Sequence, residues 1–221
     1  MKRAIIFDLD GTLVDSCAVC ITILEGMLQS RGVARSIDPF EARPLMSWGG
    51  ERMVAALLGD DCGNASDELI EFRARYNKVE TPVTSLFDGV APGLEALRNA
   101  GFALAICSNK PQQLCDKVLG DTGLAGHFDV VVGTMANLKP KPAPDLLHKT
   151  LAGLGLSVQE YVFVGDSELD HAIAEQAGMP FHFLTYGYAE EGWAPGSGSS
   201  HDHFDQLVGE LMRISPQELA V

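Results

Sequence analysis

Ala4-Ile5-Ile6-Phe7-Asp8-Leu9-Asp10-Gly11-Thr12 is the stretch that decides the fold. Its four apolar residues end abruptly in two acidic ones, a pattern typical of a strand that is buried on both faces and runs into a loop. Similar apolar runs recur along the chain at residues 102–107, 128–132, 161–164 and 181–184. These five runs predict five strands of one sheet.

Helical patterns separate the apolar runs. A capping residue or a proline opens several of them and a glycine closes several, and they cover 16–32, 89–101, 111–119, 144–153 and 169–177. Strands that alternate with helices in this way predict a parallel sheet with helices on both faces. We therefore expect an α/β fold, a Rossmann-like doubly wound parallel sheet.

One block of the chain interrupts the alternation. Between residues 38 and 77 the pattern is helical only, around 51–58 and 67–77, and no strand pattern is present. This predicts a small all-helical cap domain inserted after the first strand. We expect the core domain to comprise residues 1–14 and 83–221, and the cap domain residues 15–82.

Length and charge narrow the possible partners. A chain of 221 residues is long enough for one α/β core with a small accessory domain. Its formal net charge of −14 argues against nucleic acid or an anionic membrane as the main partner. An anionic substrate would need a local cation. No apolar run approaches the length of a membrane span, and we expect a cytoplasmic protein that is a monomer or a homodimer.

Two further sequence features are better explained by structure than by function. The five cysteines form no regular framework, and Cys17 and Cys20 are better explained as small side chains on one packed helix face than as a redox pair. The glycine- and serine-rich residues 195–200 predict a flexible loop, and His201-Asp202-His203 a solvated continuation of it. Tyr188 is expected to be a packing or loop residue.

Polar side chains follow three of the predicted strands. Asp8 and Asp10 follow the first, Ser108 and Asn109 the second, and Asp166 the fourth. Ligands of open α/β sheets bind beyond the carboxyl ends of the strands, so we expect these groups to converge. Three converging carboxylates need a cation among them, and hard oxygen ligands suit Mg²⁺.

A lysine is available near this point, in Leu138-Lys139-Pro140-Lys141-Pro142-Ala143-Pro144-Asp145. A metal ion and an ammonium group together can neutralise phosphoryl oxygens while a carboxylate attacks phosphorus. The residues therefore indicate phosphoryl transfer with Mg²⁺ as the cofactor.

Four segments together resemble the motifs of the haloacid dehalogenase superfamily. Residues 8–16 resemble the first motif, 108–111 the second, 141–144 the third and 165–170 the fourth. They occur in order, each at the end of a predicted strand or the start of a predicted helix, over essentially the whole chain. Four motifs in register are far more specific than any one of them.

The resemblance implies roles by position. Asp8 is expected to attack phosphorus and form an aspartyl-phosphate, and Asp10 to protonate the leaving oxygen and later to deprotonate the hydrolytic water. Lys141 is expected to neutralise charge on Asp8 and the phosphate. Mg²⁺ is expected to be bound by Asp8, Asp166 and the backbone carbonyl of Asp10.

The remaining motif positions are expected to contact the substrate or to support the site. Thr12, Ser108, Asn109 and Lys110 are the predicted substrate-binding residues of the core. Asp170 either takes part in the site or only caps and orients its neighbours.

Lys139 also fits the third motif. We favour Lys141, because Leu147 then falls at the usual apolar helix position after that motif.

The function predicted is hydrolysis of a small-molecule phosphate monoester. An acid at Asp10 favours phosphoryl transfer over dehalogenation, and residues 10–16, 108–111 and 185–188, with Trp48-Gly49-Gly50, are similar to phosphoglycolate phosphatases. The alternatives are a β-phosphoglucomutase-like mutase, which shares the run at 141–145 but has a Ser-Arg cap loop that is missing here, and a catalytically silent binding domain.

Recognition of a carboxylate in the substrate would need a further cation. Arg43 and Arg52 flank the glycine-containing residues 46–50 of the cap, and an arginine fork matches a carboxylate with two hydrogen bonds. Either arginine is a candidate for binding the carboxylate of the leaving group. The alternative is that both are solvated charges on cap helices.

Overall fold

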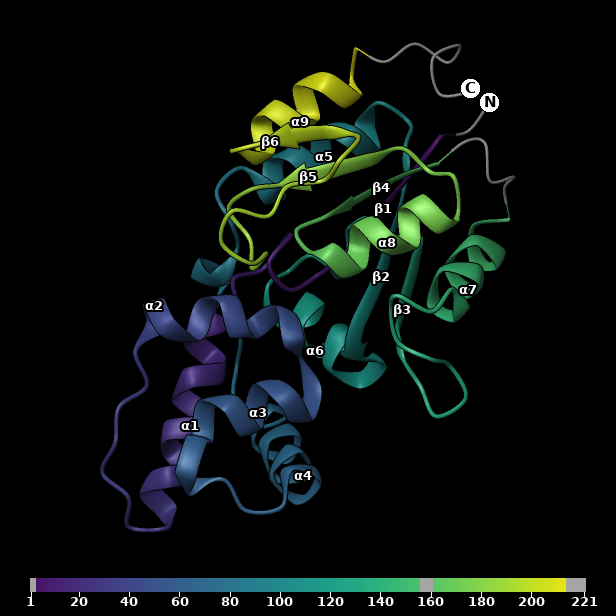
Figure 1. The fold of residues 1–221 in the computed structure, drawn as a ribbon. Helices are drawn as coiled ribbons and strands as arrows, with labels where there is room; N and C mark the ends of the chain where they lie inside the picture. The colour runs from purple at the N-terminus through teal and green to yellow at the C-terminus, as the bar shows by residue number, and fades with distance from the viewer. Residues whose placement is uncertain (1–2, 156–160, 214–221) are drawn as a thin grey trace.

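A six-stranded parallel sheet forms the centre of the molecule (Figure 1). The computed structural model describes residues 3–155 and 161–213. The strand order is β3-β2-β1-β4-β5-β6, with β1 Ala4–Phe7, β2 Ala103–Pro111, β3 Val130–Thr134, β4 Tyr161–Gly165, β5 Phe181–Leu184 and β6 Ser199–His201. The order reverses between β1 and β4, and at such a switch point a doubly wound sheet binds its ligand. The predicted α/β doubly wound fold is confirmed.

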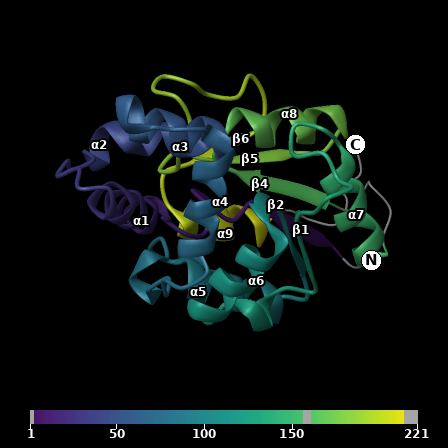
Figure 2. The ribbon, with the colours of Figure 1, turned by 90° about the horizontal axis from the view of Figure 1, so that it is seen from below.

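Helices cover both faces of this sheet (Figure 2). On one side lie α5 (Val90–Asn99), α6 (Gln112–Asp121) and α9 (Phe204–Leu211), and on the other α7 (Asp145–Leu154) and α8 (Glu168–Gln176). Alternation along β1 explains the two layers, because Ile5 and Phe7 join one apolar cluster while Ala4 and Ile6 join the other. The fully buried central strand thereby fixes the position of the acidic residues that follow it.

The helices of the cap lie beside one end of the sheet (Figure 1). They are α1 (Cys17–Ser30), α2 (Pro39–Ala42), α3 (Gly50–Leu58) and α4 (Ala65–Tyr76), with short 3₁₀ turns η1 (Arg43–Trp48), η2 (Gly59–Asp61) and η3 (Val83–Ser85), while η4 (Ala125–His127) belongs to the core. Buried apolar side chains of α1, α3 and α4 continue the same cluster that covers one face of the sheet. None of the helices in the described ranges has the length and apolar character needed to cross a membrane.

The chain enters and leaves the cap through two adjacent segments. Val14 and Leu86 form an antiparallel bridge, the Asp15 N–H donates to the Ser85 carbonyl at 2.7 Å, and the Phe87 N–H donates to the Leu13 carbonyl at 3.2 Å. Pairing of the two segments gives the cap a double connection to the core. The predicted domain limits, residues 15 and 82, stay a prediction.

The predicted loop around residue 200 was wrong. Ser199–His201 pairs in parallel with β5 as the edge strand β6, and His201 is buried rather than solvated. Its Nε2 lies 3.1 Å from Nδ1 of His182, and burial lowers the pKa of His182 to about 4. His201 is the one buried residue of this edge strand, and it pairs with the imidazole of His182 where an apolar side chain would be expected.

Cys17 and Cys20 lie buried on α1 and form no disulfide. Burial raises the pKa of the Cys17 thiol to about 11 and that of Cys20 to about 12. Thiols of such high pKa are poor nucleophiles at neutral pH, in agreement with a packing role.

Candidate active site

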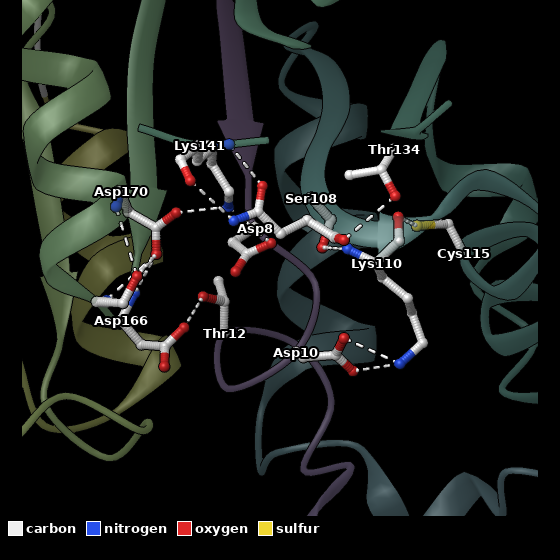
Figure 3. A network of polar contacts seen from close by, with 12 residues as sticks. Asp8, Asp10, Thr12, Ser108, Lys110, Cys115, Thr134, Lys141, Asp166 and Asp170 are labelled. Atoms are coloured by element: carbon white, nitrogen blue, oxygen red, sulfur yellow. Dashed lines mark hydrogen bonds and ion pairs between the residues drawn. The ribbon is translucent and has the colours of Figure 1, made fainter. Parts of the chain in front are cut away.

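The predicted polar residues converge at the carboxyl ends of β1, β2 and β4 (Figure 3). A cavity of about 470 Å³ opens there, between the core and the cap. Its core wall includes Asp8, Asp10, Ser108, Asn109, Lys110, Lys141 and Asp166, and its cap wall Met46–Gly50, Met53, Leu69, Phe72, Arg73 and Tyr76. The site is therefore enclosed by both parts of the chain.

Asp8 lies at the inner end of this cavity, directly after β1. Its Oδ1 is 3.0 Å from the ammonium nitrogen of Lys141. Burial raises the pKa of Asp8 to about 6, although Lys141 and a hydrogen bond from Ser108 oppose the rise. The carboxylate is thus held in a low-dielectric position where its charge is incompletely compensated.

Lys141 joins Asp8 to the fourth motif. Its Nζ also lies 2.6 Å from Oδ1 of Asp170, and although burial opposes the change, Asp170 and Asp8 raise the pKa of Lys141. Lys139 is exposed. Of the two lysines that fit the third motif, the structure brings Lys141 to Asp8.

Asp166 is fixed by several contacts. Thr12 Oγ1 donates to Asp166 Oδ1 at 2.7 Å, and the Tyr188 N–H donates to Oδ2 at 2.7 Å. The backbone packs so closely that a Cβ at Gly11 would lie 2.1 Å from Asp166 Oδ2, and one at Gly187 2.2 Å from its Cβ. Only glycine fits at these two positions, which form a cradle around the carboxylate.

Asp170 supports this arrangement from the start of α8. Its Oδ2 accepts hydrogen bonds from Ser167 Oγ at 2.7 Å and from the Ser167 N–H at 3.2 Å, and together the two residues form a capping box. Its other oxygen binds Lys141. Asp170 therefore both caps the helix and orients the lysine.

The crowding of carboxylates fits a bound cation. One oxygen each of Asp8, Asp166 and Asp170 lies within 4.8 Å of the other two. Burial, Asp170 and Asp8 together raise the pKa of Asp166 well above its usual range. Among the residues the structure describes, Lys141 is the one ammonium recorded in contact with this group. Buried hard oxygens in excess of positive charge suit Mg²⁺.

Asp10 lies two residues beyond Asp8, and its carboxylate faces Lys110 (Figure 3). The Lys110 ammonium lies 3.0 Å and 2.9 Å from the two Asp10 oxygens and 4.5 Å from the Tyr76 ring centroid. Although burial opposes the change, Asp10 raises the pKa of Lys110. Lys110 thus holds Asp10 at the cavity wall.

Ser108 and Asn109 occupy the irregular end of β2, where pairing with β3 shifts register between Cys107 and Pro111. Asn109 Oδ1 accepts from the Lys141 N–H at 2.7 Å, and Asn109 Nδ2 donates to the Lys141 carbonyl at 3.1 Å. These two bonds tie the lysine segment to the end of β2. Ser108 and Asn109 both line the cavity.

Three predicted substrate-binding residues lie outside the cavity wall, and their role in binding stays a prediction. Thr12 is fully buried and donates to Asp166. Arg43 donates to Asp15 Oδ2 and to the Tyr186 carbonyl, both at 2.7 Å. Arg52 is exposed, with its guanidinium carbon 4.4 Å from the Trp48 ring centroid.

None of the three belongs to the cavity wall. Arg43 instead binds the acidic side chain of Asp15, and Arg52 lies over the ring of Trp48.

Tyr188 lines the cavity and contacts Asp166, a position that the sequence analysis missed. Besides its backbone contact with Asp166, its hydroxyl donates to Asp15 Oδ1 at 2.7 Å. Although burial opposes the change, hydrogen bonds from Arg43 and Tyr188 lower the pKa of Asp15. Tyr188 therefore connects the cap junction to the Asp166 carboxylate.

Arg73 was missed as well. It is half-buried on α4 and lines the cavity on its cap side. Its spacing from Leu69, Phe72 and Tyr76 places it on the cavity-facing side of the helix. The spacing of three and four residues in α4 was visible in the sequence, but the sequence did not show that this side of the helix lines the cavity.

Comparison with known proteins gives consistent similarities. The model of haloacid dehalogenase-like hydrolases matches residues 5–184. The chain is 35% identical over 189 residues to a phosphoglycolate phosphatase of Xanthomonas campestris pv. campestris, covering 84% of each protein. It is 35% identical over 193 residues to that of Aquifex aeolicus, covering 85% of this chain and 87% of the relative.

Solved structures show the same fold. A predicted phosphoglycolate phosphatase from Haemophilus somnus superposes with a TM-score of 0.79 at 24% identity, over 95% of this chain and 98% of that one. A mutant of CbbY from Rhodobacter sphaeroides in complex with xylulose-(1,5)bisphosphate superposes with a TM-score of 0.73 at 23% identity, over 94% of this chain and 96% of that one.

Proposed function

The chain belongs to the haloacid dehalogenase-like hydrolase family and is a phosphatase acting on phosphate esters; from this premise we propose that it hydrolyses phosphoglycolate or a similarly small monoester. We propose further that it is Mg²⁺-dependent and works through an aspartyl-phosphate on Asp8. The observation that supports this proposal best is that Asp8, Asp10 and Lys141 line one cavity between the core and the cap.

Asp8 is the nucleophile in this mechanism. Its carboxylate oxygen attacks phosphorus, the bond from phosphorus to the ester oxygen breaks, and the phosphoryl group is transferred to Asp8. Asp8 retains only 13% side-chain exposure, so little water remains to stabilise the free carboxylate.

Asp10 moves the protons. It donates one to the departing alkoxide, and then, as a carboxylate, accepts one from the water that attacks the aspartyl-phosphate. This second displacement releases inorganic phosphate and regenerates Asp8. Lys110, bound to both Asp10 oxygens, positions the group and stabilises it whenever it is ionised.

Lys141 stabilises the charge that develops on the phosphoryl oxygens. Its ammonium is already fixed between Asp8 and Asp170, so little reorganisation is needed when phosphate arrives. Ser108 and the Asn109 backbone line the cavity beside it and are the proposed hydrogen-bond donors to the other phosphoryl oxygens.

Mg²⁺ would be held by Asp8, Asp166 and the backbone carbonyl of Asp10. When bound, it neutralises the carboxylates and the phosphate so that the two anionic partners can approach. Thr12 and Tyr188 keep Asp166 in one orientation, as partners of metal ligands commonly do.

The size of the cavity is that of an ordinary small-molecule site. Its volume of about 470 Å³ has to hold the phosphoryl group, the leaving group and the metal's water. The proposed partner is therefore a small phosphorylated metabolite. The proposed location is the cytoplasm, where the five free cysteines would remain reduced.

Substrate profiling with purified protein tests this function. Phosphate release from phosphoglycolate and from a panel of sugar phosphates is measured with Mg²⁺, while the remaining ester is analysed for isomerisation. We expect phosphate release, with phosphoglycolate among the best substrates. Conversion of one sugar phosphate into its isomer supports the mutase instead, and no reaction with any ester contradicts the assignment.

A further inference from the structure

We propose that Arg73 binds the carboxylate of the substrate's leaving group and so selects phosphate esters that carry a second anion. This inference rests on the proposed phosphatase function and adds the residue that reads the part of the substrate remote from phosphorus.

The basic residues of the cavity differ in their partners. Lys141 contacts Asp8 and Asp170, and Lys110 contacts both oxygens of Asp10. Arg73 is the third basic residue of the wall, and among the described residues no ion pair or hydrogen bond of its guanidinium is recorded. It is therefore available to a ligand, while both lysines are committed to the catalytic carboxylates.

The surroundings of Arg73 strengthen its attraction for an anion. Leu69, Phe72 and Tyr76, on the same face of α4, line the cavity with it. Burial lowers the pKa of Arg73, and Glu51, which is exposed, offsets this lowering only in part. A partly desolvated guanidinium beside apolar walls gains more from a bound carboxylate than one in water does.

Position also separates Arg73 from the phosphoryl site. Arg73 belongs to the cap wall, whereas Asp8, Lys141 and Asp166 belong to the core wall. A substrate with phosphate at the core therefore extends its leaving group toward the cap. The planar guanidinium can donate two parallel hydrogen bonds to a carboxylate there.

A carboxylate fits better than a second phosphate. One guanidinium balances the single charge of a carboxylate, whereas a terminal phosphate carries close to two charges and leaves one uncompensated inside the cavity. Arg43 and Arg52 do not line the cavity and offer no second cation.

Paired substrates test the inference. The value of kcat/KM is measured for phosphoglycolate, for 2-hydroxyethyl phosphate, which is of similar size without a carboxylate, and for a sugar bisphosphate. Arg73→Met is expected to lower kcat/KM for phosphoglycolate roughly 10- to 100-fold, as loss of a charged hydrogen-bond pair does. It should change the value for 2-hydroxyethyl phosphate less than about 3-fold.

Arg52→Met is the matched control, because it removes the same charge from the cap at an exposed position outside the cavity. It should leave the preference for phosphoglycolate unchanged. Arg73→Lys keeps the charge without the fork and should recover part of the loss. Thermal melting of each variant shows whether the fold is intact.

The outcomes separate the inference from the function on which it rests. Equal losses with both monoesters, or no loss, overturn the role of Arg73 while leaving the phosphatase intact. A selective loss with the sugar bisphosphate instead means that Arg73 reads a phosphate, and overturns the carboxylate assignment. Wild-type protein that releases phosphate from none of the three esters contradicts the proposed function itself.

Discussion

Replacing Asp8, the proposed nucleophile, by asparagine should stabilise the metal-free protein while abolishing its activity. The carboxylate is largely desolvated, with an oxygen of Asp170 and one of Asp166 within 4.8 Å, and its charge is only partly offset by Lys141. Asparagine has nearly the same shape and no charge. The substitution therefore removes an electrostatic penalty along with the nucleophile, as is common where function and stability conflict.

The size of the effect follows from the pKa of Asp8. Burial raises it from 3.8 to about 6, and each pKa unit corresponds to about 1.4 kcal/mol. Ionised Asp8 thus costs the folded state up to about 3 kcal/mol. For a chain of this length that corresponds to a rise in melting temperature of up to roughly 6–12 °C in Asp8→Asn.

The dependence on pH has a definite sign. Because the folded state holds the proton of Asp8 more tightly than the unfolded state does, stability falls as pH rises from about 4 to about 6. Above that window the penalty is complete, and below it Asp8 is neutral in both states. The advantage of Asp8→Asn should therefore be largest at pH 7.5 and vanish near pH 4.

Thermal melting in excess chelator across this pH range provides the measurement. Asp60→Asn, at an exposed position outside the site, is the control and should show no such pH-dependent advantage. With Mg²⁺ present, wild type should gain more stability than Asp8→Asn, because the variant lacks the charge of a proposed metal ligand. An Asp8→Asn protein that is less stable than wild type at pH 7.5 without metal would refute this reasoning.

Three other perturbations probe separate parts of the site. Lys141→Ala should lower kcat by about 100-fold or more, since an ammonium facing the phosphoryl group is lost, whereas Lys139→Ala should change kcat by less than about 3-fold. A larger loss of kcat in Lys139→Ala than in Lys141→Ala, measured in steady-state assays, means that Lys139 is the third-motif lysine. Chelation should abolish phosphate release, with full recovery in Mg²⁺ and poor recovery in Ca²⁺, whose coordination shell is larger and more variable; full activity in excess chelator excludes the metal. Tyr188→Phe should lower the free energy of unfolding by about 1 kcal/mol, because the hydroxyl loses its hydrogen bond to Asp15. The value of kcat should change by no more than a few-fold, because the hydrogen bond to Asp166 comes from the Tyr188 backbone. A large loss of kcat at unchanged stability contradicts a purely positioning role.

The central residues of the site were predictable because short local sequence patterns, each an apolar run followed by an aspartate, identify them. Each of β1 and β4 is a short apolar run that ends in an aspartate, and parallel strands bring their ends to one edge. Asp8 and Asp166 therefore meet although 158 positions separate them in the numbering. The glycines at 11 and 187 could be noticed in the sequence, but their packing against Asp166 could not.

The partners of the cap residues were not predictable because they depend on tertiary placement. Arg43 binds Asp15 and the Tyr186 carbonyl, partners that are 28 and 143 positions away. The sequence showed an arginine beside a flexible stretch, but not which acid it would meet. Likewise, the 3-and-4 spacing of α4 identifies the face that carries Arg73 without saying that this face closes over Asp8.

β6 was missed for a different reason. Ser199–His201 is three polar residues long, so neither alternation nor an apolar run was present to indicate a strand. Its one buried residue, His201, contacts His182, and a contact between two histidines that are 19 positions apart gives no periodic signal.

Direct detection of a phosphorylated Asp8 tests the central claim. Wild-type protein is mixed with phosphoglycolate and Mg²⁺, quenched in acid within the first turnover and digested, and the peptide that contains Asp8 is analysed by mass spectrometry. The mechanism predicts an acid-stable, hydroxylamine-sensitive phosphoryl group on Asp8 that is absent from Asp8→Asn. Rapid release of phosphate with no phosphoryl group on Asp8, or with a phosphoryl group on another residue, would contradict the mechanism.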